Sequence, residues 1–211
     1  MTGTTHDVET PQGTARVHLH PADGARALLM LGHGAGGGVA APDLVIATGV
    51  AQGLGIAVAL VEQPYRVAGR RSSVPAPRLD MAWTAVADHL RAGPGSALPL
   101  ITGGRSSGAR VACRTAAASG ASGVLCLAFP LQPPARAGAA PRPDRLPELA
   151  AVTVPVLIVQ GERDPFGMPT EAPGRRVVRL AGDHSLKSDA AGLRAAVGGW
   201  LTDVLGAPRP G

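Results

Sequence analysis

The chain has 211 residues, 45% of them apolar, so it can form one domain with a substantial core and is too apolar for a disordered chain. Its net charge of +5 comes mostly from scattered arginines and only 2% of residues are aromatic, which argues against a nucleic-acid partner. No apolar run reaches the roughly 18 residues of a membrane span, and the N-terminus lacks a signal pattern. We therefore expect a cytoplasmic protein without a membrane partner.

Strand and helix patterns alternate along the chain. Short apolar or β-branched runs predict strands, and apolar residues at helical spacing predict helices. In chain order, the expected strands are Ala15–His20, Ala27–Leu31, Ile56–Val61, Leu98–Thr102, Gly123–Phe129, Pro155–Gln160 and Arg176–Leu180. The expected helices are Asp43–Gln52, Leu79–Arg91, Ser107–Ala118 and Asp189–Val204. We expect the proline-rich segment Pro130–Pro147 to be mostly irregular.

This alternation predicts βαβ units, and hence an α/β fold with a mostly parallel central sheet and helices on both faces. We expect a single domain over residues 1–211, with flexible ends at about 1–13 and 206–211. Sheets of this kind bind ligands at the carboxyl ends of their strands. Polar residues directly after predicted strands are therefore candidates for the site, and they are His33, Glu62, Ser106, Asp164 and His184.

A nucleophile motif stands between a predicted strand and a predicted helix. Residues Gly104 to Gly108 read Gly-Arg-Ser-Ser-Gly, which matches the Gly-x-Ser-x-Gly pattern of a sharp strand-to-helix turn. Glycines two residues before and after leave room for such a turn, and the following helix N-terminus supplies free N–H groups. The motif predicts Ser106 as a catalytic nucleophile.

A serine hydroxyl needs a base, because it is a weak nucleophile at neutral pH. His184 and Asp164 each follow a predicted strand, and the order Ser, Asp, His is that of hydrolases with this turn. We expect His184 to be the base and Asp164 to orient it. Glu162 and Asp183 are competing acids, and we prefer Asp164 because the side chains of adjacent residues, such as Asp183 and His184, rarely face one another.

Backbone N–H groups are expected to form the oxyanion hole. Ser107 follows the nucleophile, and Ala35 lies in the glycine-rich loop after the second predicted strand. The residues expected to bind substrate are Gln63, Tyr65, Arg66, Arg105 and Phe129. The two cysteines, Cys113 and Cys126, match no metal-ligand spacing, and we expect neither a metal nor a cofactor.

These motifs resemble the α/β-hydrolase superfamily over nearly the whole chain, and within it the dienelactone-hydrolase-like group. The resemblance rests on residues 33–36, 62–65, 104–108, 129–131, 161–164 and 183–185. It implies a minimal hydrolase without a lid domain. Dienelactone hydrolases use a cysteine nucleophile, whereas this chain has Ser106, so their lactone substrate is not implied. The resemblance favours a serine esterase with a small-molecule ester as its partner, and leaves homo-oligomer formation open.

Two other functions stay open at this stage. Gly32 to Gly37 fits the Gly-x-Gly-x-x-Gly pattern of a dinucleotide-binding oxidoreductase, and Glu62 ends the next predicted strand. Against it, a strand precedes the motif and the segment from Gly38 to Pro42 interrupts the helix that should begin there. The second alternative is a non-catalytic interaction module on the same fold, since a fold does not imply a function.

Overall fold

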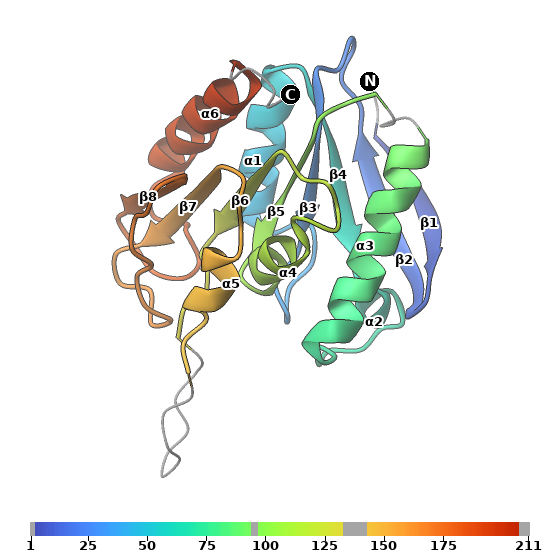
Figure 1. The fold of residues 1–211 in the computed structure, drawn as a ribbon, viewed down its shortest axis with the longest axis horizontal. Coiled ribbons are helices and arrows are strands. Elements are labelled where there is room, and N and C mark those ends of the chain that lie inside the picture. The colour runs from blue at the N-terminus through green and yellow to red at the C-terminus, as the bar shows by residue number, and fades with distance from the viewer. Residues whose placement is uncertain (1–2, 94–96, 133–142, 207–211) are drawn as a thin grey trace.

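One mixed sheet organises the protein in the computed structural model, which describes residues 3–93, 97–132 and 143–206 (Figure 1). Its strands are β1 Thr4–Thr10, β2 Gly13–His20, β3 Ala27–Gly32, β4 Ile56–Glu62, β5 Leu100–Arg105, β6 Gly123–Leu127, β7 Val156–Gly161 and β8 Arg175–Leu180. Their order is β1-β2-β4-β3-β5-β6-β7-β8. Pairing is parallel from β4 to β8, whereas β1–β2 and β2–β4 are antiparallel. The predicted α/β fold is confirmed.

Helices cover both faces of the sheet. They are α1 Pro42–Gly53, α2 Pro64–Val67, α3 Ala76–Ala92, α4 Ser107–Thr115, α5 Leu146–Ala150 and α6 Ala190–Gly206. Helices α1 and α6 pack together on one face, and α3, α4 and α5 lie on the other (Figure 1). No lid domain stands over the sheet within the described residues.

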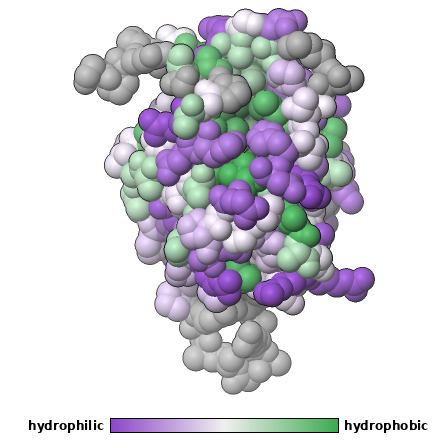
Figure 2. Space-filling model, turned by 90° about the vertical axis from the view of Figure 1, so that its right-hand side faces the viewer, coloured by the Kyte–Doolittle hydropathy of each residue, from purple (hydrophilic) through white to green (hydrophobic). Residues whose placement is uncertain are grey.

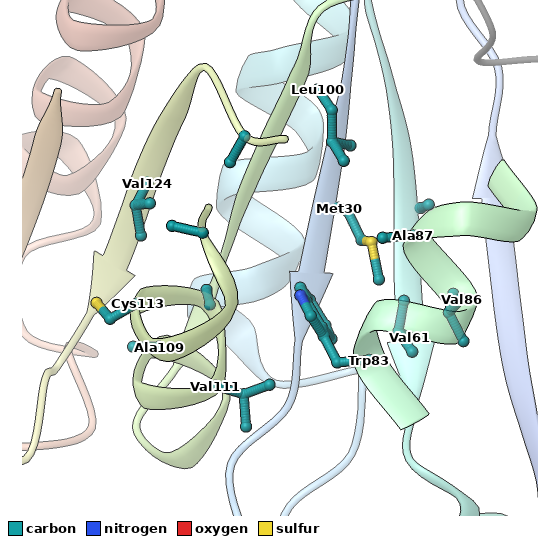
Figure 3. Packing of buried hydrophobic residues seen from close by; sticks show 14 of the residues in the cluster. Met30, Val61, Trp83, Val86, Ala87, Leu100, Ala109, Val111, Cys113 and Val124 are labelled. Carbon is teal, nitrogen blue, oxygen red and sulfur yellow. The ribbon is translucent and has the colours of Figure 1, made fainter. Parts of the chain in front are cut away.

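The sheet separates two apolar cores, because successive side chains of a strand point to opposite faces. On β3, Leu28 and Met30 belong to the core under α3 and α4, while Leu29 and Leu31 belong to the core under α1 and α6. Figure 3 shows the first core, where Trp83 of α3 lies among apolar side chains from β3, β4 and α4. All six residues of β3 are buried, which explains its continuous apolar run.

The N-terminal end was expected to be flexible, and the structure corrects this expectation. Residues Thr4–Thr10 form strand β1, which pairs along its whole length with β2. Only Val8 of this edge strand is buried, so the segment carries no apolar alternation that could predict it. Cross-strand contacts hold it instead: Arg16 of β2 contacts both carboxylate oxygens of Asp7, at 2.7 and 3.1 Å. At the other end, Gly206 closes α6 and residues 207–211 lie outside the described part.

Element bounds differ from the predictions near the site. Strand β5 runs to Arg105 instead of ending at Thr102, so the nucleophile candidate follows the strand directly. Helix α4 ends at Thr115, three residues early, before the turn at Gly120. The short helices α2 and α5 were not predicted, and α5 begins within the segment expected to be irregular. Residues 133–142 of that segment lie outside the described residues.

The surface beside β1 and α3 is mixed in character. Figure 2 shows this face as mostly hydrophilic, with small, separated hydrophobic areas and no single large one. Within the described residues, none of the helices is long and apolar enough to span a membrane.

Candidate active site

Ser106 stands at a turn that only glycine neighbours permit. It joins β5 directly to α4, and its φ of 53° lies in a region that non-glycine residues rarely adopt. A Cβ atom on Gly104 or Gly108 would collide with the backbone of Gly32 on the adjacent strand. The Ser106 N–H donates to the carbonyl of Leu127 at 2.9 Å, which ties the turn to β6. The Gly-x-Ser-x-Gly pattern therefore reflects close approach between neighbouring strands.

The three residues expected to act together are in contact. Ser106 Oγ lies 2.9 Å from Nε2 of His184, and Nδ1 of the same ring lies 2.8 Å from Oδ2 of Asp164. An ionised carboxylate can only accept, so Nδ1 carries the proton and Nε2 is free to accept one from the serine hydroxyl. Residues 78 and 20 positions apart in the chain thus form one continuous hydrogen-bond chain.

Asp164 is held in place by donors other than the histidine. Its side chain is 1% exposed. Oδ2 accepts from Nε2 of Gln160 at 2.8 Å, and Oδ1 accepts from the N–H of Phe166 at 2.9 Å. The Gln160 amide nitrogen also reaches the carbonyls of Phe129 and Gly167, at 3.0 and 2.9 Å. Sequence reasoning missed Gln160, although a polar residue in the buried strand Val156–Gly161 is a usable signal.

The competing acids are engaged elsewhere. Asp183 is exposed and accepts from the N–H and hydroxyl of Ser185, at 2.9 and 2.7 Å. These bonds, with the hydroxyl bond as the largest cause, lower the pKa of Asp183. Glu162 is exposed, and its N–H pairs with the carbonyl of Leu180. Of the three acids considered, the structure places Asp164 against the His184 ring.

An aromatic side chain that the sequence analysis did not single out also positions His184. The ring of Phe166 meets the His184 ring edge-on, with centroids 4.5 Å apart. Because the Phe166 N–H also donates to Asp164, Phe166 contacts both Asp164 and the His184 ring. His184 keeps a side chain that is 18% exposed, so a substrate can still approach it.

The glycine-rich loop after β3 is braced against the nucleophile turn. His33 is buried, its Nδ1 donates to the carbonyl of Gly34 at 2.7 Å, and its Nε2 accepts the N–H of Gln63 at 3.1 Å. These partners require the neutral ring, and burial, the largest cause, lowers the pKa of His33. The Tyr65 hydroxyl donates to the carbonyl of Ala35 at 2.8 Å. The loop is thereby fixed at both Gly34 and Ala35.

Both oxyanion candidates lie beside the nucleophile turn. Ser107 is the first residue of α4, so its N–H has no acceptor within the helix. A Cβ atom placed on Gly34 would lie 3.7 Å from the Cβ of Ser106, so the loop that carries Ala35 runs close to the serine. Ala35 itself is exposed. The roles of Ala35 and Ser107 stay predictions, because they depend on a bound oxyanion.

Several residues expected to bind substrate make contacts within the protein, and for Gln63 and Tyr65 a contact with substrate stays a prediction. Phe129 is fully buried in the core, which corrects that expectation for its side chain. Gln63 is buried and donates to the carbonyl of Leu79 at 3.2 Å. Tyr65 is buried and braces the loop through its hydroxyl. Arg66 is partly exposed, and its guanidinium reaches the carbonyl of Arg70 at 3.3 Å, so its expected contact with substrate stays a prediction.

Arg105, which was also expected to bind substrate, makes two contacts within the protein. Its Nε lies 2.8 Å from Oδ2 of Asp43, and its Nη2 donates to the backbone carbonyl of His184 at 3.0 Å. Both contacts are with the protein itself, and the expected contact of this guanidinium with substrate stays a prediction. Asp43 was not a candidate, because an acid in the first turn of a helix is common.

A hollow of about 250 Å³ adjoins the glycine-rich loop. It lies between α2, the β1–β2 turn and the start of α3, and residues such as Tyr65, Arg70 and Arg78 line it. Neither Ser106 nor His184 is among its lining residues. The hollow therefore lies beside the candidate active site, and Ser106 and His184 do not open into it.

The dinucleotide alternative does not fit the local geometry. Helix α1 begins at Pro42, five residues beyond Gly37, so the helix N-terminus does not stand at the glycine motif. Glu62, which would have to bind a ribose, instead contacts Nε2 of His18 at 3.2 Å. The oxidoreductase interpretation loses both of its supports.

Comparisons with known proteins agree with this geometry. Residues 25–192 match the family model described as an alpha/beta hydrolase domain. Among solved structures, XC6422 from Xanthomonas campestris, a serine hydrolase without a lid, is 20% identical with a TM-score of 0.77, covering 99% of this chain and 98% of its own. A dienelactone hydrolase from Anabaena variabilis is 17% identical with a TM-score of 0.69, covering 96% and 97%.

A third similar structure is an esterase from Pyrococcus furiosus. It is 13% identical with a TM-score of 0.75, covering 97% of this chain and 93% of its own. At such identities these likenesses show the fold. No curated protein is significantly similar in sequence to this chain.

Proposed function

Because the chain belongs to the alpha/beta hydrolase domain family, we propose that it is a serine hydrolase that cleaves carboxylic esters through an acyl-enzyme on Ser106. The observation that carries the proposal is the hydrogen-bond chain from Ser106 Oγ through His184 to Asp164, at 2.9 and 2.8 Å. An esterase from Pyrococcus furiosus has a similar fold, and ester cleavage is the acyl transfer that we propose for this chain.

The proposed reaction has two halves. Ser106 Oγ attacks the ester carbonyl while Nε2 of His184 takes its proton, and Asp164 stabilises the imidazolium that forms. The N–H groups of Ser107 and Ala35 bind the oxyanion. The tetrahedral intermediate breaks its bond to the alcohol oxygen, which receives the proton from His184. Water then attacks the acyl-enzyme with His184 again as base, and releases the carboxylic acid and Ser106.

The direct test is covalent labelling with a fluorophosphonate, followed by mapping of the modified residue by mass spectrometry. We expect the label on Ser106, and we expect Ser106→Ala to lose on the order of 10⁴ to 10⁶ in kcat for p-nitrophenyl acetate while it folds normally.

Ser107→Ala is the matched control, since the neighbouring serine contributes only its backbone N–H and should keep activity within a few-fold. Full esterase activity in a pure, folded Ser106→Ala protein would refute the assignment of Ser106 as the nucleophile. Absence of both labelling and esterase activity in the unmutated protein would instead favour the non-catalytic interaction module.

A screen of p-nitrophenyl esters with varied acyl length would then define the substrate. We expect short esters to be cleaved faster than long-chain ones, because no lid forms an extended apolar tunnel over the described residues.

A further inference from the structure

Arg105 occupies an unusual position for a charged residue. It is the last residue of β5 and immediately precedes Ser106, and its backbone is paired with Leu127 of β6. Its side chain is only 21% exposed. A substitution there therefore places a different side chain one residue from the nucleophile without changing the register of the strand.

The guanidinium joins three segments that are distant in sequence. Nε contacts Asp43 in the first turn of α1 at 2.8 Å, and Nη2 donates to the carbonyl of His184 at 3.0 Å, 79 residues away. Nη1 packs 3.2 Å from the place where Gly34 would carry a Cβ atom. A Cβ atom at position 34 would therefore make a tight contact with the guanidinium.

Asp43 forms a close ion pair with the guanidinium. Its side chain is fully buried, and its Oδ1 accepts the N–H of Leu44 at 3.0 Å. Burial, the largest cause, raises the pKa of Asp43, and the positive charge of Arg105 opposes that effect. A buried carboxylate that loses its partner is strongly unfavourable. The ion pair therefore keeps the guanidinium beside α1, from where Nη2 reaches the His184 carbonyl.

The carbonyl that the guanidinium binds belongs to the proposed base. The His184 ring must reach Ser106 on one side and Asp164 on the other, and its backbone lies in the loop between β8 and α6. A displacement of about 1 Å in a reacting group can cost on the order of 100-fold in rate. Fixing the His184 carbonyl limits such displacement in a loop that is not part of a strand or helix.

We propose that Arg105, anchored by Asp43, is a positioning residue that fixes the backbone of His184, and that it acts on hydrolysis through this histidine and not by binding substrate. The proposal rests on the proposed function, because it assigns Arg105 to the base of that reaction. It also explains why a charged side chain is largely shielded from solvent directly beside the nucleophile.

The test compares Arg105→Lys in two backgrounds, the unmutated protein and His184→Ala. Lysine keeps a positive charge near Asp43 but has a single nitrogen, so it cannot hold Asp43 and the His184 carbonyl in the same fork geometry. In the unmutated protein we expect kcat for p-nitrophenyl acetate to fall about 10- to 100-fold, with KM within about twofold. In His184→Ala, we expect the residual rate to change less than about twofold, because the positioned group is gone.

Arg110→Lys is the matched control. Arg110 is a similarly shielded arginine, and it pairs with Glu148 instead of a residue of the site. We expect it to lower the melting temperature and leave kcat unchanged. Asp43→Asn should lower kcat in the same direction as Arg105→Lys, and combining the two should lower kcat no further than about twofold below Arg105→Lys alone.

The outcomes separate the two proposals. The positioning role would be overturned if Arg105→Lys lowered kcat by the same factor in both backgrounds. A rise in KM with kcat unchanged would overturn it as well. A large loss in Ser106→Ala and His184→Ala together with a fully active, folded Arg105→Lys would overturn it while leaving the proposed function intact. Full activity of Ser106→Ala would refute the proposed function, and this proposal would fall with it.

Discussion

At the scale of single residues, environment separates side chains of the same chemical type. Asp164 and Asp183 both lie within 20 positions of His184 along the chain, but Asp164 is buried against Gln160 and the histidine ring, whereas Asp183 is exposed and bound to Ser185. A carboxylate that accepts the Nδ1–H of an imidazole selects one tautomer, and further donors to its oxygens fix the carboxylate in place. Asp164 has such donors on both oxygens.

We expect catalysis to depend on the Asp164 carboxylate and not on the two neighbouring acids. Asp164→Asn should cost about 10⁴ in kcat, because an amide can donate to Nδ1 and favour the wrong tautomer of His184. Glu162→Gln and Asp183→Asn should each cost less than about tenfold. The measurement is kcat for p-nitrophenyl acetate, with circular dichroism as the control for folding. If Asp183→Asn is the variant that abolishes activity, the assignment of the acid is wrong.

At the scale of elements, the loop after β3 depends on a neutral histidine. His33 donates from Nδ1 and accepts at Nε2, so protonation would place an N–H against the N–H of Gln63. The Tyr65 hydroxyl holds the next carbonyl of the same loop. The loop is therefore held by its own His33 ring, by the backbone N–H of Gln63 and by the Tyr65 hydroxyl from α2.

We expect the stability of the folded protein to depend on pH through His33. Burial lowers the pKa of His33 in the folded protein, so the unfolded chain binds the proton more tightly. The contribution of neutral His33 is fully present above the unfolded pKa of about 6.5 and is lost as the pH falls from there toward the lower folded pKa. The urea midpoint should decrease over this range.

His33→Gln can still accept the Gln63 N–H and should flatten this decrease. His20→Gln is the comparison, since burial also lowers the pKa of His20, but less of that ring is shielded from water. The decrease should stay largely intact in His20→Gln. If it is equally steep in His33→Gln and the unmutated protein, the pH dependence originates elsewhere.

At the scale of the whole molecule, the sheet divides the apolar residues into two cores, and the candidate site stands where its strands end. Trp83 of α3 is fully buried and packs near Gly32, at the end of β3 that leads into the glycine-rich loop (Figure 3). The core under α3 and α4 thus supports both α4, which follows Ser106, and β3, which leads into the glycine-rich loop.

We expect a truncated side chain in that core to lower the stability of the whole molecule. Trp83→Ala should lower the free energy of unfolding by about 3–5 kcal/mol, through lost burial and the cavity it leaves. Met81→Ala on the same helix, at a side chain that is 47% exposed, should change it by less than about 0.5 kcal/mol. Urea unfolding at one pH gives both values. Similar losses in the two variants would mean that α3 is not packed as described.

The sequence by itself determined the features that depend on short-range pattern: the buried strands, the Gly-x-Ser-x-Gly turn, and the order of Ser106, Asp164 and His184 after their strands. Parallel strands end at one edge, so local signals already brought these three together. Only the tertiary structure decided the pairing of Arg105 with Asp43, the support of Asp164 by Gln160, and the burial of Phe129. It also placed β1, which has a single buried residue and exists through pairing with β2. The physical reason is that each of these depends on which partner a side chain or strand meets in space, and that partner leaves no periodic signal in the chain.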